Sequence, residues 1–180
     1  MLMKRFLAVA LSLMLFILCG CSSRKANDVS LKNNSMITFT DALGREVSVC
    51  KNPQRTAALI GSFADVWNLA GGSVCASADD AWDDFGLTLD GAVNLGGAHS
   101  PSLELLFLAE PDFVIASAST AADVDMKDVL ENANITAAYF DVDCFEDYLH
   151  MLDICTDITG RKDLYEKNGL NIKNQIEKVK

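Results

Sequence analysis

The sequence has few of the residues on which most catalytic and metal sites depend. Only two histidines occur in 180 residues, His99 and His150. The chain contains no G-x-G-x-x-G, no G-x-x-x-x-G-K-[ST] and no G-x-S-x-G motif, so the common nucleotide-binding and nucleophile signatures are missing. The scarcity of histidine also leaves few general bases and few zinc or manganese ligands. The sequence therefore disfavours an enzyme and predicts no metal site.

Basic residues are scarce as well. Lysine and arginine total 15 against 25 aspartates and glutamates, which gives a formal net charge of −10. Such a chain repels phosphate backbones and anionic lipid headgroups, so nucleic acid is not expected as a partner.

No hydrophobic run is long enough to span a bilayer. The apolar stretch at residues 6–18 follows Lys4 and Arg5 and is interrupted only by Ser12, whereas a spanning helix needs about 20 residues. A basic start, a short apolar segment and small residues at its end are typical of a secretory signal peptide, here residues 1–20. The run Leu18-Cys19-Gly20-Cys21 resembles a bacterial lipobox, which predicts that Cys21 is lipidated after cleavage.

Removal of residues 1–20 takes away two basic residues and no acidic one, so the formal charge moves to near −12. Residues 21–36 are polar and predict a flexible tether between the lipid and the fold. The sequence therefore predicts an extracytoplasmic protein anchored to the cell membrane by a lipid.

Four further cysteines lie beyond the lipidation site: Cys50, Cys75, Cys144 and Cys155. Export permits disulfides, but the spacings contain no C-x-x-C pair and leave any pairing open. Cys75 and Cys155 fall in apolar patterns, which favours small buried side chains at these two positions.

Apolar strand-like runs alternate with amphipathic helical patterns after residue 36. The pattern predicts a hairpin at 37–50 turning at 42–44, strands at 56–60, 74–78, 92–95, 113–116 and 135–140, and helices at 63–70, 101–110, 123–133 and 145–159. Three helix starts carry candidate caps: Ser62 with Asp65, Ser100 before Pro101, and Asp143 with Glu146. We therefore expect an α/β fold, a doubly wound and mainly parallel sheet with an N-terminal hairpin and a long C-terminal helix.

A doubly wound sheet binds ligands beyond the carboxyl ends of its strands. The loops expected at this edge are residues 61–63, 79–85, 96–100, 117–120 and 141–143. Their candidate ligand-binding residues are Ser62, Phe63, Trp82, Phe85, His99 and Ser117. The aromatic side chains suit a flat or bulky ligand. None of these loops contains lysine or arginine, which argues against an anionic ligand.

Three stretches resemble a known family. They are ITFTDALGREV at 37–47 followed by Pro53 and Arg55, SLELLFLAEPDFVI at 102–115, and GRK at 160–162 before a long helical segment. In this order, over residues 37–180, they resemble the substrate-binding proteins of ABC importers for ferric siderophores, haem and cobalamin.

The resemblance implies two α/β lobes joined by a rigid helix, with the ligand in the cleft between them. Residues 37–160 would form the N-terminal ligand-binding lobe and residues 161–180 the truncated start of the interlobe helix. The family's motif places its permease-docking glutamate at Glu104, and the partners implied are the ABC permease and a small metal-chelate ligand, with no cofactor. Two alternatives stay open: a ligand-free lobe acting as a surface interaction lipoprotein, and a zinc or manganese receptor.

Overall fold

A two-stranded hairpin opens the folded part of the chain. The computed structural model describes residues 35–178, so the predicted signal peptide, Cys21 and most of the tether lie outside the described residues. Strands β1 (Met36–Thr40) and β2 (Glu46–Cys50) pair antiparallel. The carboxylate of Asp41 accepts the backbone N–H groups of Leu43 at 3.1 Å and Arg45 at 3.0 Å, and Gly44 takes a positive φ of 75°. The predicted hairpin and its turn are confirmed, with an aspartate side chain holding the turn.

The main sheet has five parallel strands. Their order is β5-β4-β3-β6-β7, with bounds Thr56–Ala58 for β3, Val74–Ser77 for β4, Val93–Asn94 for β5, Phe113–Ser117 for β6 and Thr136–Phe140 for β7. Every residue of β6 is buried, as expected for a central parallel strand covered on both faces. The sheet confirms the predicted doubly wound α/β class.

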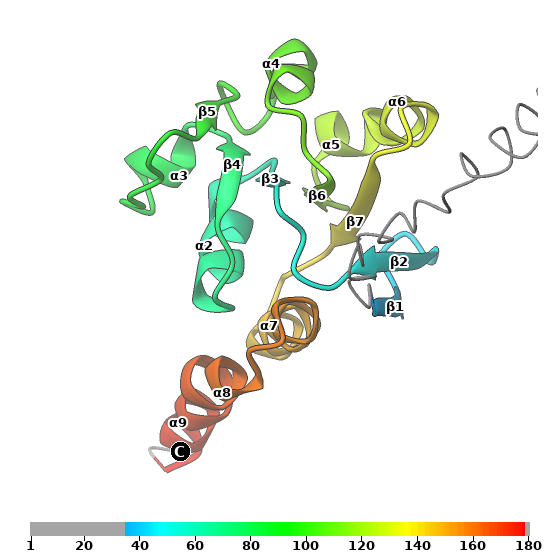
Figure 1. Ribbon diagram of the computed structural model, residues 1–180. Coiled ribbons are helices and arrows are strands. Elements are labelled where there is room, and N and C mark those ends of the chain that lie inside the picture. Colours follow the sequence, from blue (N-terminus) through cyan, green and yellow to red (C-terminus); the bar gives the residue numbers. More distant parts are fainter. Residues whose placement is uncertain (1–34, 179–180) are drawn as a thin grey trace, which may run out of the picture. The chain divides into compact units, whose positions relative to one another are not determined.

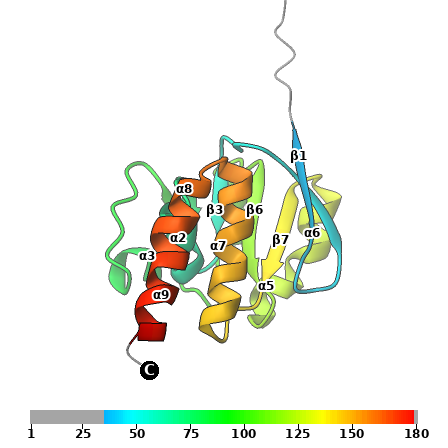
Figure 2. The ribbon, with the colours of Figure 1, turned by 90° about the horizontal axis from the view of Figure 1, so that it is seen from below.

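Helices cover both faces of this sheet (Figures 1 and 2). They are α2 (Gly61–Leu69), α3 (Asp80–Asp83), α4 (Leu103–Leu108), α5 (Ala121–Asp125), α6 (Lys127–Asn132) and α7 (Phe145–Thr159). On the α2 and α7 face, Trp67 packs edge-to-face on Phe113 with ring centroids 5.9 Å apart. On the opposite face Leu106 and Leu130 are fully buried. The two cores together bury both sides of each central strand.

The first predicted helix cap is wrong. Helix α2 begins at Gly61 with Ile60 in the cap position, and no side chain of its own segment caps it. Instead the Gly61 N–H donates to both carboxylate oxygens of Asp80, each at 2.9 Å. A carboxylate from the next connection thus replaces the predicted Ser62 and Asp65 pair.

The other two caps are displaced along the chain. Helix α4 is capped by Ser102, whose Oγ accepts the Leu105 N–H at 3.3 Å, and not by Ser100. Helix α7 is capped by Asp147, whose carboxylate accepts the N–H groups of Cys144 at 3.0 Å and Asp143 at 3.2 Å. Glu146 therefore does not fill the predicted capping role, because Asp147 at the third helical position reaches back to the cap.

Several helical segments also differ from expectation. The predicted loop at 79–91 contains the short helix α3, and the single helix predicted at 123–133 is divided into α5 and α6 at Met126. Phe107 and Val129 are 37 % and 38 % exposed. Only Leu106 of the α4 apolar run is fully buried, so this short helix exposes more apolar surface than its sequence suggests.

The C-terminal segment is helical, as predicted, but it contains a π-helical turn. Helix α7 ends at Gly160 in the left-handed conformation, and α8 (Lys162–Tyr165), a π-helix (Glu166–Leu170) and α9 (Asn171–Lys178) follow. At the π-helix, Asn168 donates its side-chain amide to the carbonyl of Leu69 at 2.8 Å, and its own carbonyl accepts the Tyr148 hydroxyl at 2.9 Å. These contacts hold the C-terminal helix against α2 and α7 (Figure 2).

Among residues 35–178, no helix combines the length and the apolar character that a membrane crossing requires.

Candidate functional site

The carboxyl ends of the parallel strands meet at one edge of the sheet. From the central strand β3 the chain winds outward to β4 and β5, then returns to β6 and β7 on the other side. The reversal places the connections after β3 and β6 next to each other, which is where α/β sheets usually bind ligands. The five predicted edge loops follow these five strands, so this edge is the candidate site.

Asp80 joins the connections after β3 and β4. Its carboxylate receives the Gly61 N–H, as described above. A Cβ atom at Gly61 would lie 2.4 Å from the Ala81 backbone nitrogen, so only glycine allows this approach. The start of α2 and the start of α3 are therefore locked together at the edge.

Asp123 is a buried carboxylate at the same edge. The whole residue is 0 % exposed, and its Oδ2 accepts the Ser117 N–H at 2.8 Å. Its Oδ1 is buried and has no hydrogen-bond partner within the described part of the chain. Burial raises the pKa of Asp123 to about 6, and the charge of Asp80 adds to the rise, while the Ser117 N–H and His99 oppose it.

This carboxylate was missed by the sequence reasoning, which treated Asp123 only as the start of a helix. Its helix α5 follows β6 closely, and the Tyr139 hydroxyl donates to the Asp123 carbonyl at 3.1 Å. The charges of Asp80 and His99 both act on the pKa of Asp123. The fold thus brings together residues from the connections after β4, β5 and β6.

The six predicted ligand-binding residues occupy different environments. Ser117 is 2 % exposed, and its hydroxyl lies 3.0 Å from that of Ser119. Phe63 is 4 % exposed and packs edge-to-face on Phe140, with ring centroids 6.3 Å apart, so its ring belongs to the core.

The remaining four lie nearer the surface. Ser62 is half-buried, Trp82 is half-buried against the core, and Phe85 and His99 are exposed. A ligand-binding role for the six stays a prediction.

The edge carries negative charge almost exclusively. The five loops contain six carboxylates, one histidine and no lysine or arginine. With the buried carboxylate beneath them, these residues form what we call the acidic edge: Asp79, Asp80, Asp83, Asp84, Asp123, Asp141 and Asp143. Its potential attracts cations and repels anions.

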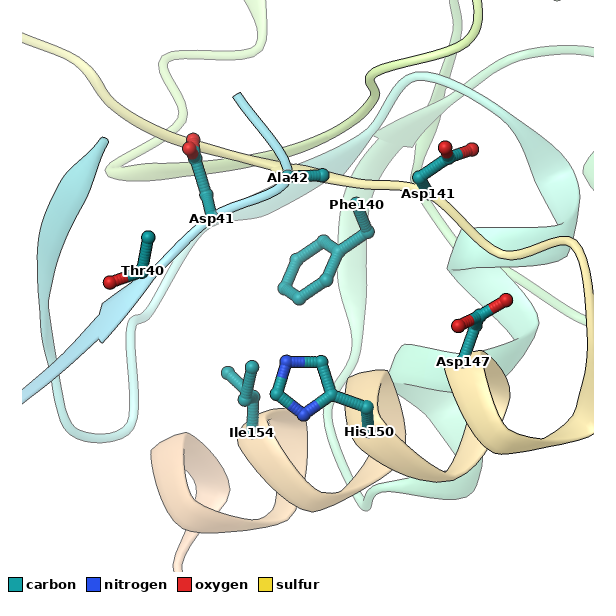
Figure 3. A pocket seen from close by; sticks show the side chains of 8 residues that line it. All are labelled: Thr40, Asp41, Ala42, Phe140, Asp141, Asp147, His150 and Ile154. Atoms are coloured by element: carbon teal, nitrogen blue, oxygen red, sulfur yellow. The ribbon is translucent and has the colours of Figure 1, made fainter. Parts of the chain in front are cut away.

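A small cavity of about 120 Å³ lies beside this edge (Figure 3). It is lined by Thr40, Asp41, Ala42, Phe140, Asp141, Asp147, His150 and Ile154. Figure 3 shows the His150 ring and Ile154 pointing from α7 toward Phe140. The Asp41 carboxylate forms an ion pair with Arg45 at 2.7 Å. The cavity therefore lies where the hairpin turn, the end of β7 and α7 pack together. Sequence reasoning missed it because its walls are about 100 residues apart.

Glu104 is exposed in the first turn of α4, where the predicted docking glutamate was expected to be accessible. One turn later, Leu108 is 71 % exposed. A carboxylate and an apolar side chain thus share one exposed face of this helix. The docking role of Glu104 stays a prediction.

The four described cysteines are all free thiols. Cys155 is fully buried, as its pattern predicted, and burial raises the pKa of its thiol; Cys75 is half-buried. Cys50 and Cys144 are exposed. Within residues 35–178, no group of three or more His, Cys, Asp or Glu side chains is placed to hold a metal ion.

Solved structures are similar to most of this chain. The catecholate-siderophore binding protein VctP from Vibrio cholerae matches with a TM-score of 0.65 and 15 % identity, over 81 % of this chain and 53 % of its own. The petrobactin-binding protein YclQ from Bacillus subtilis matches with a TM-score of 0.66 and 19 % identity, over 81 % and 53 %. A periplasmic heme binding protein from Pseudomonas aeruginosa matches with a TM-score of 0.60 and 18 % identity, over 70 % and 45 %.

The chain has the fold of these binding proteins. It spans about half the length of each of the three. No protein-family model and no curated protein matches the sequence.

Proposed function

We propose that this chain provides the N-terminal ligand-binding lobe of the extracytoplasmic receptor of an ABC importer. The lobe, residues 37–160, captures a small metal-chelate ligand such as an iron siderophore, haem or cobalamin, and residues 161–180 begin the interlobe helix. The chain acts by binding and delivery to the permease, without catalysis.

The observation that carries the proposal is the shared fold. Proteins named for binding catecholate siderophores, petrobactin and haem share it over about half their length. The sequence stretches that resemble this receptor family support it independently: the hairpin at 37–47, the α4 to β6 segment at 102–115 and the turn at Gly160.

The anchoring and docking parts of the proposal rest on single residues. Cys21 receives the lipid and holds the protein at the outer face of the cell membrane. Glu104, exposed in the first turn of α4, pairs with arginine on the permease. An exposed carboxylate suits a bidentate contact with a guanidinium group.

Ligand titration of the purified full chain tests the proposal. Trp82, half-buried in the connection after β4, is a natural fluorescence reporter, with Trp67 fully buried as an internal reference. We expect saturable quenching by at least one of haem, cobalamin or a ferric siderophore. A Trp82→Phe variant should lose this signal, which would assign the quenching to Trp82. No binding of any of these ligands at millimolar concentration would overturn the proposal.

A surface interaction lipoprotein is the second candidate. The observation in its favour is the exposed pair Phe107 and Leu108 on α4, adjacent to Glu104. Large exposed apolar side chains beside a charge are typical of protein interfaces. Retention of the permease complex by a chain that binds no ligand would favour this second function over the first.

A further inference from the structure

We propose that Cys50 and Met36 form a binding site for a soft monovalent metal ion such as Cu(I) on the solvent-facing side of the hairpin. The site is separate from the edge loops of the proposed function. The hairpin turn bonds to the end of β7 through the Ala42 N–H and the Tyr139 carbonyl, whereas Cys50 and Met36 lie at the other end of the two strands.

The pairing of β1 with β2 places both sulfur atoms on the same face. Met36 lies directly opposite Cys50 in the antiparallel register. Side chains alternate between the two faces of a strand, and the buried residues of β2 are Val47 and Val49, so Cys50 lies on the solvent side. Met36 is 48 % exposed. Directly opposed residues have Cβ atoms about 5 Å apart, so these two side chains can meet.

The two sulfur atoms are in contact. The Cys50 Sγ donates to the Met36 Sδ, and the two atoms lie 3.3 Å apart. Metal–thiolate bonds are about 2.3 Å long, so one ion bonded to both sulfurs can hold them up to about 4.6 Å apart. The observed distance falls within that span, and the flexible methionine side chain allows it to widen.

The kind of ligand atom selects the ion. Thiolate and thioether sulfur are soft ligands, which favour Cu(I) over magnesium, calcium and manganese. Structural zinc sites use four ligands, and residues 35–178 contain no group of three or more His, Cys, Asp or Glu side chains placed to hold a metal. Monovalent copper is satisfied by two sulfur ligands. On binding, the ion replaces the proton of the Cys50 thiol, which passes to solvent, and no electron is transferred.

Cys144 provides a comparison within the same chain. It is exposed like Cys50, but its neighbour is the Asp147 carboxylate, which accepts the Cys144 N–H at 3.0 Å. The hydrogen bond with the Asp147 side chain raises the pKa of the Cys144 thiol. A thiol that keeps its proton beside a hard oxygen ligand does not make a soft two-sulfur site, so Cys144 serves as the control.

Copper competition on the full chain tests the proposal. Cys19 and Cys21 are replaced by serine in every sample, so that the two N-terminal thiols do not contribute. Cu(I) is titrated, without oxygen, against the chromophoric chelator bicinchoninate. We expect the parent chain to withdraw one equivalent of Cu(I) from the chelator, and X-ray absorption of the bound copper to show two sulfur ligands.

Three variants assign the site. Cys50→Ser should weaken Cu(I) binding about 100-fold or more and Met36→Leu about tenfold, while Cys144→Ser should stay within about twofold of the parent chain. Because the Cys50 and Met36 side chains face solvent, their variants should keep the melting temperature of the parent. Met36→Leu also keeps an apolar side chain of similar volume, so it removes only the sulfur.

The outcomes separate this site from other copper binding. If Met36→Leu holds Cu(I) as tightly as the parent chain, the thioether is not a ligand and the inference is wrong. The inference is also wrong if Cys144→Ser loses as much affinity as Cys50→Ser, or if the parent chain withdraws no copper from the chelator. Each of these results leaves the proposed function standing, because neither Cys50 nor Met36 is a candidate for ligand binding or docking.

Discussion

The variant Asp123→Asn should unfold with a different pH dependence from the wild type. In the folded chain burial and the charge of Asp80 raise the pKa of Asp123 from an ordinary 3.8 to about 6. The folded state therefore binds the Asp123 proton more tightly than the unfolded state does. By linkage, the stabilisation is complete below about pH 4 and is lost as the pH rises through about 6.

The size of the effect follows from the shift. Each pKa unit corresponds to about 1.4 kcal/mol, so a rise of the Asp123 pKa from 3.8 to about 6 amounts to roughly 3 kcal/mol of unfolding free energy lost between pH 4 and pH 7.5. An asparagine cannot ionise, and its side-chain oxygen can still accept the Ser117 N–H. The amide nitrogen of the asparagine would take the position of Oδ1, where no hydrogen-bond partner is available. This unsatisfied buried group would lower the unfolding free energy by about 1–3 kcal/mol at every pH.

Urea denaturation of both chains at half-unit steps from pH 4 to pH 8 measures the difference. We expect the unfolding free energy of the wild type to fall by about 3 kcal/mol over this range and that of Asp123→Asn to stay nearly level. The control Asp125→Asn removes an exposed carboxylate from the same helix and should follow the wild type. A wild type whose stability rises from pH 4 to pH 7, or an asparagine variant that keeps the full decline, would refute the assignment.

Three further predictions concern single positions. Gly61→Ala should lower the unfolding free energy by about 2 kcal/mol or more, because the new methyl group would lie 2.4 Å from the Ala81 backbone nitrogen. Thermal or urea unfolding measures this loss of stability, and an unchanged stability would contradict the close packing. Cys21→Ser should release the exported protein from membranes into the soluble fraction. A wild-type protein found in the soluble fraction after export would contradict the lipid-anchor proposal. Glu104→Arg should weaken co-purification with the cognate permease about tenfold or more while leaving the melting temperature unchanged, and equal recovery of this variant and the wild type would count against docking through α4.

Much of the architecture could be predicted from local sequence. The hairpin follows from alternation on both sides of Gly44, and the end of α7 follows from Gly160, which takes the left-handed conformation that glycine favours. The continuous apolar runs at β6 and β7 predict buried parallel strands, because a strand covered on both faces carries apolar side chains on both. These features depend on residues that are close in the sequence, so the spacing of apolar residues and glycines is enough to predict them.

The candidate site depends on contacts between residues far apart in the sequence, which the spacing of apolar residues does not reveal. Sequence reasoning placed the edge loops correctly after the strands. It could not show that the ring of Phe63, one of the ligand-binding candidates, packs edge-to-face on Phe140. It also missed the buried carboxylate of Asp123. A side chain's direction at the start of a helix depends on the crossing of that helix over the sheet, which only the packed structure defines.

The sequence by itself thus determined the alternation of strands and helices along the chain, the sign of the charge at the edge and the absence of basic residues there. Only the tertiary structure decided which carboxylates act together. Asp80 caps α2 from another connection, and the charges of Asp80 and His99 act on the pKa of Asp123, because the sheet brings the ends of β3, β4, β5 and β6 to one edge. Burial then turns an ordinary aspartate into a group that titrates near pH 6, since desolvation depends on the atoms packed around a carboxylate and not on its neighbours in the chain.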